Sequence, residues 1–137
     1  MQIIARSGLT PPRPGMLILF LPVSRLLTSI HKAPLMTISH GFHAAIPARP
    51  GKGDALVALL LDAPAIDNDD CLVFLVGRSA NTPDLVFLTE GWRSEAAHGR
   101  AFNSAAGKAY TARLAQFVGG ETQYADELPV GGKAVLG

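Results

Sequence analysis

Cysteine, net charge and long apolar runs are all scarce in this sequence, and each scarcity excludes a class of protein. The single cysteine, Cys71, cannot close an intramolecular disulfide or build a cysteine-rich zinc site. This excludes a disulfide-stapled scaffold and a zinc finger, and it favours a reducing compartment, so the predicted location is the cytoplasm. Lys and Arg total 12 against 11 Asp and Glu. Because nucleic-acid binding needs a clustered basic surface, no nucleic-acid partner is predicted.

The apolar runs are too short to cross a membrane as a helix. The run at residues 16–23 has eight residues, whereas a spanning helix needs about 20. It resembles the core of a signal peptide, but Pro22 interrupts it and no small-residue cleavage site follows. We therefore predict no membrane partner. Residues 1–36 are expected to be an N-terminal extension, disordered or absent from the native protein, with Met36 as an alternative start.

From Thr37 onward, strand-forming and helix-forming segments alternate. Four segments have the apolar, β-branched or aromatic residues typical of strands: residues 38–48, 71–77, 85–92 and 121–125. The second and third are joined by a turn and are apolar on both faces. Because the helices of so small a domain cover only one face of a sheet, the other face needs a partner, most simply a second copy of the chain.

Two helical segments separate these strands. In the first, leucine and alanine recur at helical spacing over residues 56–63, between Asp54, a suitable N-cap, and Pro64. The second follows Ser94, another suitable cap, and can break at Gly99 or near residues 103–104. The resulting order, βαββαβ, is that of the ferredoxin-like α+β fold, with four antiparallel strands and the helices on one side.

Short motifs within this frame resemble the antibiotic biosynthesis monooxygenase family. They are residues 46–54 (IPARPGKGD), the strand start Cys71-Leu72, and residues 88–94 (LTEGWRS) running on to Tyr110. The resemblance implies a dimeric α+β barrel, in which two ferredoxin-like subunits pack sheet against sheet and each keeps a pocket between its sheet and its helices. We expect this domain at residues 37–127, followed by a tail at residues 128–137.

The resemblance also implies cofactor-independent monooxygenation of a quinol or phenolic, polyketide-like aromatic by dioxygen. No cofactor is predicted, because Gly51-Lys52-Gly53 is too short for a dinucleotide fingerprint or a P-loop. A deprotonated polyphenol is itself a reductant for dioxygen, so the protein needs only to exclude water, remove a proton and stabilise an oxyanion. The predicted partners are a small aromatic substrate, dioxygen and a second copy of the chain.

Trp92 and His98 are the predicted catalytic residues. Trp92 shares a strand face with Glu90, and its indole N–H can donate to a substrate oxygen; the alternative is a core tryptophan bonded to backbone. His98, in the following helix, can act as a general base. Family members often have a histidine at the position of Ala101, so the role of His98 is not carried over from the family. Glu90 is expected to have a structural role, as the partner of an arginine or as a cap.

His43, Asn103 and Tyr110 are the predicted substrate-binding residues. Tyr110 matches the family's spacing and can line the pocket or belong to the core, and Asn103 lies on or beside the same helix. His43 can face the pocket from the first strand or be a core residue. His40 lies three residues from His43 and therefore points to the opposite face, so no metal site is predicted.

Two alternative functions stay open. Haem degradation, which some relatives of this fold perform, requires an axial histidine in the pocket. A non-catalytic dimeric module that binds a small hydrophobic molecule is consistent with the alanine at position 101.

Overall fold

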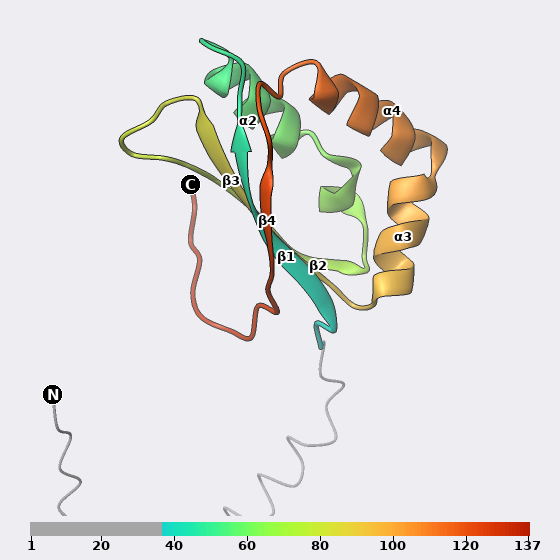
Figure 1. Cartoon of the computed structure of the whole chain (residues 1–137). Helices are drawn as coiled ribbons and strands as arrows, with labels where there is room; N and C mark the ends of the chain where they lie inside the picture. The colour runs from blue at the N-terminus through green and yellow to red at the C-terminus, as the bar shows by residue number, and fades with distance from the viewer. Residues whose placement is uncertain (1–36) are drawn as a thin grey trace, which may run out of the picture. The chain divides into compact units, whose positions relative to one another are not determined.

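A four-stranded antiparallel sheet lies at the centre of the described structure, a computed structural model that describes residues 37–137. The strands are β1 (His40–Pro47), β2 (Cys71–Arg78), β3 (Leu85–Trp92) and β4 (Gln123–Asp126). They lie in the order β2-β3-β1-β4 (Figure 1). This order confirms the predicted ferredoxin-like α+β fold. The expected N-terminal extension, residues 1–36, lies outside the described residues.

The helices connect the strands across one face of the sheet (Figure 1). Helix α2 (Gly53–Leu61) and the short 3₁₀ helix η2 (Pro64–Asp67) lead from β1 to β2. Helices α3 (Glu95–Asn103) and α4 (Ala105–Ala115) lead from β3 to β4. Within residues 37–137, no helix is long and apolar enough to span a membrane.

The hydrophobic core lies between α2 and the helix-facing side of the two central strands. It consists of Ala44, Ile46, Ala48, Leu56, Leu60, Val86 and Leu88. Side chains alternate along a strand, so every second residue of β1 and β3 reaches this side. Burial of one leucine side chain contributes roughly 1.5–3 kcal/mol. Leu56 and Leu60 are both fully buried, so they fix α2 on one half of the sheet.

The start of α2 differs from the expected cap. Asp54 lies inside the first turn and forms an ion pair with Arg78, at 2.6 Å. The carboxylate of Asp84, from the loop between β2 and β3, instead accepts the backbone N–H groups of Gly51 and Gly53 at 2.9 and 3.0 Å. Because this partner is distant in sequence, the local pattern could not reveal it.

The second helical stretch breaks at Ser104, as the sequence allowed. Ser94 caps α3 by accepting the N–H of Ala97 at 3.0 Å, which confirms that cap. Ser104 has an extended backbone, with ψ 161°, and caps α4 by accepting the N–H of Gly107 at 3.0 Å. The break changes the direction of the chain, so α3 and α4 cover different parts of the sheet (Figure 1).

The other face of the sheet has no helix among residues 37–137. The C-terminal tail lies on this side (Figure 1). The N–H of Glu127 donates to the carbonyl of Gly41 at 3.2 Å, and a side chain at Gly41 or Gly91 would meet Pro129. Further along this face, Leu75 is 40% exposed. Covering of this face by a second copy stays a prediction.

Candidate functional site

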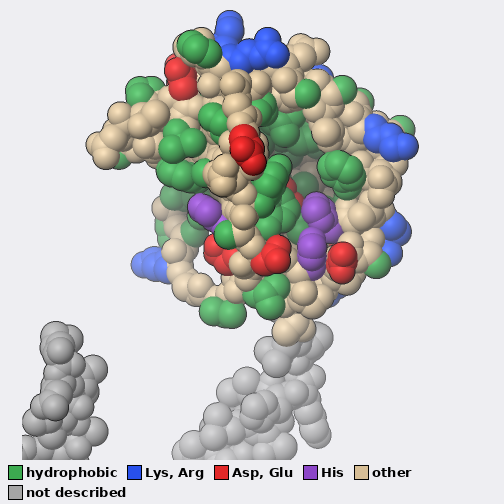
Figure 2. Space-filling model, in the orientation of Figure 1, with side chains coloured by type: hydrophobic (Ala, Val, Ile, Leu, Met, Phe, Trp, Pro, Cys, Tyr) green, Lys and Arg blue, Asp and Glu red, His purple; other side chains and the backbone are tan. Residues whose placement is uncertain are grey.

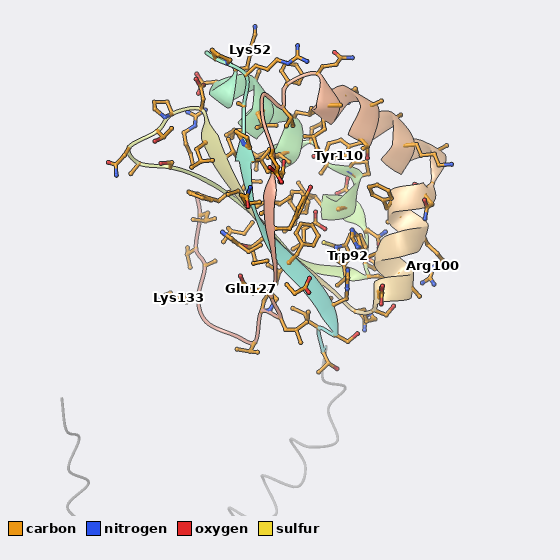
Figure 3. All side chains as sticks on the ribbon, in the orientation of Figure 1. Lys52, Trp92, Arg100, Tyr110, Glu127 and Lys133 are labelled. Atoms are coloured by element: carbon orange, nitrogen blue, oxygen red, sulfur yellow. The ribbon has the colours of Figure 1, made fainter. Side chains whose placement is uncertain are left out.

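A cavity of about 760 Å³ lies between the sheet and helices α3 and α4. Figure 2 shows histidine side chains at its opening, beside apolar side chains. Figure 3 shows Trp92 of β3 and Tyr110 of α4 within the space between sheet and helices. The polar side chains along the cavity include His40, Glu90, His98, Tyr110 and Asp126. Its volume is typical of sites that enclose a small organic molecule.

Glu90 and Trp92 form the floor of this cavity on β3. They are two residues apart on a strand and therefore share a face. Glu90 is 8% exposed and Trp92 is 1% exposed. The indole N–H of Trp92 donates to Oε2 of Glu90 at 2.6 Å. The sequence predicts that this N–H donates to a substrate oxygen; in the structure the neighbouring carboxylate accepts it.

The environment of Glu90 makes its carboxyl harder to ionise than it is in water. Burial raises the pKa of Glu90, while the hydrogen bond from Trp92 and the charge of His40 act in the opposite direction. The expected arginine partner is absent from the Glu90 contacts in residues 37–137. The partners of Glu90 are instead the indole of Trp92 and the ring of His98, whose Nε2 lies 3.8 Å from Oε2.

His98 contacts a second histidine as well. Its Nδ1 lies 3.0 Å from Nε2 of His40, the first residue of β1. The two rings are tilted by 31°, with centroids 5.0 Å apart. Burial lowers the pKa of His98, the charge of His40 lowers it further, and the charge of Glu95 opposes both. His98 is therefore neutral near neutral pH and can accept a proton. We call Glu90, His98 and His40 the carboxylate–histidine chain.

Tyr110 brings an unpaired donor to the same cavity. Its hydroxyl oxygen is buried and has no hydrogen-bond partner in the described structure. Burial and the charge of Glu90 raise the pKa of Tyr110, so the phenol keeps its proton at neutral pH. A buried polar group without a partner costs about 1–3 kcal/mol. A ligand oxygen placed against this hydroxyl would remove that cost.

Aromatic and charged residues surround the opening of the cavity. Phe102 of α3 is 54% exposed and Tyr124 of β4 is 70% exposed, and both line the cavity. Flat apolar rings of this kind pack well against an aromatic ligand. Arg100 also lines the opening, where Nη2 lies 3.9 Å from the carboxylate of Asp70.

The structure brings three of the five predicted site residues together. Trp92, His98 and Tyr110 line the cavity, whereas His43 and Asn103 do not. His43 lies on the opposite face of the sheet, where its Nδ1 is 3.0 Å from Oγ1 of Thr89. Asn103 lies at the exposed end of α3 and donates to the carbonyl of Gly99 at 2.9 Å. Both side chains therefore lie outside this cavity.

Sequence reasoning missed His40 and undervalued Glu90. The two-residue period placed His40 and His43 on opposite faces but did not say which face meets the helices. The pairing of His40 with Trp92 in the β1–β3 register decides it, and that register is a long-range property. Glu90 was placed on the correct face, but its partners come from tertiary contacts.

Neither a metal cluster nor a reactive thiol accompanies these residues in the described part of the chain. No group of three or more His, Cys, Asp or Glu side chains there is arranged to hold a metal ion. Burial and the charge of Glu90 raise the pKa of Cys71 to about 11. This thiol therefore stays protonated and weakly nucleophilic at neutral pH.

The sequence and the fold match the same group of proteins. Residues 40–113 match the family model described as antibiotic biosynthesis monooxygenase. A Chloroflexus aurantiacus protein, provisionally named an antibiotic biosynthesis monooxygenase, is 25% identical with a TM-score of 0.62, over 69% of this chain and 96% of its own. A Nitrosomonas europaea protein with the same provisional name is 11% identical with a TM-score of 0.61, over 71% and 95% of the two chains.

A further solved structure, from Pseudomonas aeruginosa, is 21% identical with a TM-score of 0.59, over 72% of this chain and 100% of its own. The similarities to the Nitrosomonas and Pseudomonas proteins support the fold alone. No functionally curated protein matches this sequence significantly.

Proposed function

This chain belongs to the antibiotic biosynthesis monooxygenase family, and from that premise we propose that it is a cofactor-independent monooxygenase that oxidises a small quinol or phenolic aromatic with dioxygen. The observation that carries the proposal is the cavity of about 760 Å³. It combines aromatic walls with a neutral imidazole, His98, and an unpaired hydroxyl donor, Tyr110.

The proposed reaction converts a hydroquinone and dioxygen into a hydroxyquinone and water. Removal of a phenolic proton gives a phenolate, whose ring carbon forms a C–O bond with dioxygen. Loss of water from the resulting hydroperoxide, with the proton of that carbon, breaks the O–O bond and leaves a carbonyl. The substrate supplies all four electrons, and two of its hydrogens leave in the water. No external reductant is needed.

Four side chains of the cavity have a place in this reaction. Nε2 of His98 accepts the phenolic proton, because the lowered pKa keeps the ring neutral beforehand. Glu90 lies beside the cationic ring that results, at 3.8 Å, and Trp92 holds the carboxylate in position. The hydroxyl of Tyr110 donates to the substrate oxygen that becomes negative.

The charges around the cavity favour an uncharged phenol over an aromatic carboxylate. Glu90, Asp70 and Asp126 all line it, and each would repel an anion. Within residues 37–137, Arg100 is the only Lys or Arg that lines the cavity, and it already lies near Asp70. A planar ring also suits the exposed aromatic side chains at the opening.

We propose in addition that the protein is a cytoplasmic homodimer. The face of the sheet that no helix of residues 37–137 covers, called here the uncovered face, supports the dimer, because it presents Leu75, which is 40% exposed, and the half-buried ring of Phe87. The scarcity of cysteine supports the location.

Oxygen consumption with a panel of hydroquinones and anthrones tests the proposed activity. With ¹⁸O₂, we expect one labelled oxygen in the product and one in water. We expect His98→Gln to lower kcat by about 10²–10⁴-fold, the usual contribution of a general base. Asn103→Ala, which alters an exposed side chain of the same helix outside the cavity, is the matched control and should leave kcat unchanged.

Three results would contradict the proposal. They are product formation under argon, tight binding of a phenol without turnover, and a Soret shift with added haem that disappears in the His98→Gln variant. The second result favours the binding module, and the third favours haem chemistry.

A further inference from the structure

The contact between His40 and His98 constrains which ring nitrogen of each carries a proton. The Nε2 atom of His40 and the Nδ1 atom of His98 are 3.0 Å apart, with both rings at the cavity. A hydrogen bond between two imidazole nitrogens needs an N–H on one and a lone pair on the other. The protonation of one ring therefore determines the tautomer of the other.

We infer that His40 is a positioning residue that holds His98 in its basic tautomer and releases it when His40 is protonated. This inference rests on the proposed role of His98 as the general base. While Nε2 of His40 has a lone pair, it accepts the proton on Nδ1 of His98. The Nε2 atom of His98 then keeps its own lone pair and can accept a substrate proton.

Protonation of His40 reverses this arrangement. Both of its nitrogens then carry protons, so its Nε2 donates and Nδ1 of His98 must accept. The neutral His98 ring consequently carries its proton on Nε2, on the side of the Glu90 carboxylate, whose Oε2 lies 3.8 Å away. In this tautomer His98 cannot take a proton from the substrate. Protonation of His40 therefore closes the site by exchange of tautomers, without any charge on His98.

The titratable groups that act on His98 or line the same cavity include residues from four elements. Glu90 lies on β3, Glu95 on α3, Asp126 on β4 and Tyr110 on α4. The carboxylates favour a proton on the histidine pair, whereas burial of His98 opposes it.

Nuclear magnetic resonance of ¹⁵N-histidine-labelled protein tests the tautomers without any assay of activity. At neutral pH, we expect the proton of His98 on Nδ1 and a lone pair on Nε2. On acidification, the His98 proton should move to Nε2 as His40 becomes doubly protonated. His43→Gln, a change on the opposite face of the sheet, should leave both His98 signals unchanged. A His98 proton already on Nε2 at neutral pH would overturn the inference.

Two variants of His40 separate a positioning role from simple packing. In His40→Gln, the amide oxygen can still accept from Nδ1 of His98, so kcat should stay within about threefold and the activity loss that follows His40 protonation should disappear. His40→Leu fills the space without an acceptor, and kcat should fall by about 10²-fold with KM unchanged. Equal losses in both variants, or no loss in His40→Leu, would refute the positioning role. If the wild type oxidises no phenol, the proposed function fails, while the tautomer measurement still decides the inference.

Discussion

Glu90 is the most buried acidic side chain among residues 37–137, and few hydrogen bonds replace the water that its carboxyl loses. It is 8% exposed, and its one short hydrogen bond comes from the indole of Trp92, at 2.6 Å. A buried charge needs several partners to offset the loss of water. Burial therefore raises the pKa of Glu90, and the single hydrogen bond from Trp92 offsets only part of this rise.

The raised pKa of Glu90 makes the stability of the protein depend on pH, and the variant Glu90→Gln removes that dependence. Because the folded-state pKa is raised, the contribution of Glu90 is fully present below the ordinary glutamate value of about 4.3 and is lost as pH rises through the folded-state pKa. Glutamine keeps an acceptor for Trp92 but does not titrate. The free energy of unfolding of Glu90→Gln relative to wild type should therefore increase between pH 4 and pH 7, as measured by urea unfolding.

The exposed Glu121 provides the control for that measurement. Glu121→Gln should change stability by less than about 0.5 kcal/mol at either pH. A Glu90→Gln difference that is constant with pH would show that the carboxyl ionises as easily in the folded chain as in the unfolded one.

The residues of the site also show what the sequence could predict. Strand alternation correctly placed Glu90 and Trp92 on one face, because that property is local. It could not show that the indole of Trp92 donates to the side chain of Glu90, because the packing of the folded domain decides which hydrogen bonds two groups on one face form. The sequence also could not show which of His40 and His43 faces the helices, because the pairing register of β1 and β3 decides this.

At the scale of the elements, the sequence predicted the bounds of a helix or strand correctly where nearby turn or cap residues define both of its ends. The strand at residues 85–92 was predicted with its observed bounds, between a turn and the cap Ser94. The α3–α4 break was also visible, because Ser104 can cap a helix. The start of α2 was not, because Asp84 reaches it from another loop. Contacts between distant segments are therefore the part of the fold that the local sequence pattern does not predict.

The α3–α4 junction sets the position of Tyr110, and two glycines test it. A Cβ at Gly107 would collide with the carbonyl of Ala101, whereas a Cβ at Gly99 meets nothing within 4 Å. Gly99→Ala should therefore stabilise the protein by about 0.5–1 kcal/mol, the usual gain within a helix. Gly107→Ala should destabilise it by more than about 1 kcal/mol, because backbone has to move. Urea unfolding of both variants measures the difference, and similar values would show that the junction is not tightly packed.

At the scale of the whole domain, the two faces of the sheet have different chemistry. The helix-facing side contains the core and the cavity, with its acids and histidines. The other side presents Leu75, Phe87 and His43, and the tail lies against it at Gly41 and Gly91. A sheet with two apolar faces and helices on one side leaves surface that a second copy can bury.

The homodimer proposal predicts that a charge on the uncovered face separates the subunits. In Leu75→Glu, the carboxylate would have to be buried between two sheets, so sedimentation equilibrium should give a monomer where the wild type gives a dimer. Leu61→Glu is the matched control, since Leu61 is 60% exposed on α2, on the helix side of the sheet. It should leave the dimer intact. A monomeric wild type would refute the homodimer. A dimer disrupted by Leu61→Glu and not by Leu75→Glu would place the contact between subunits elsewhere, because only burial of the uncovered face makes position 75 intolerant of charge.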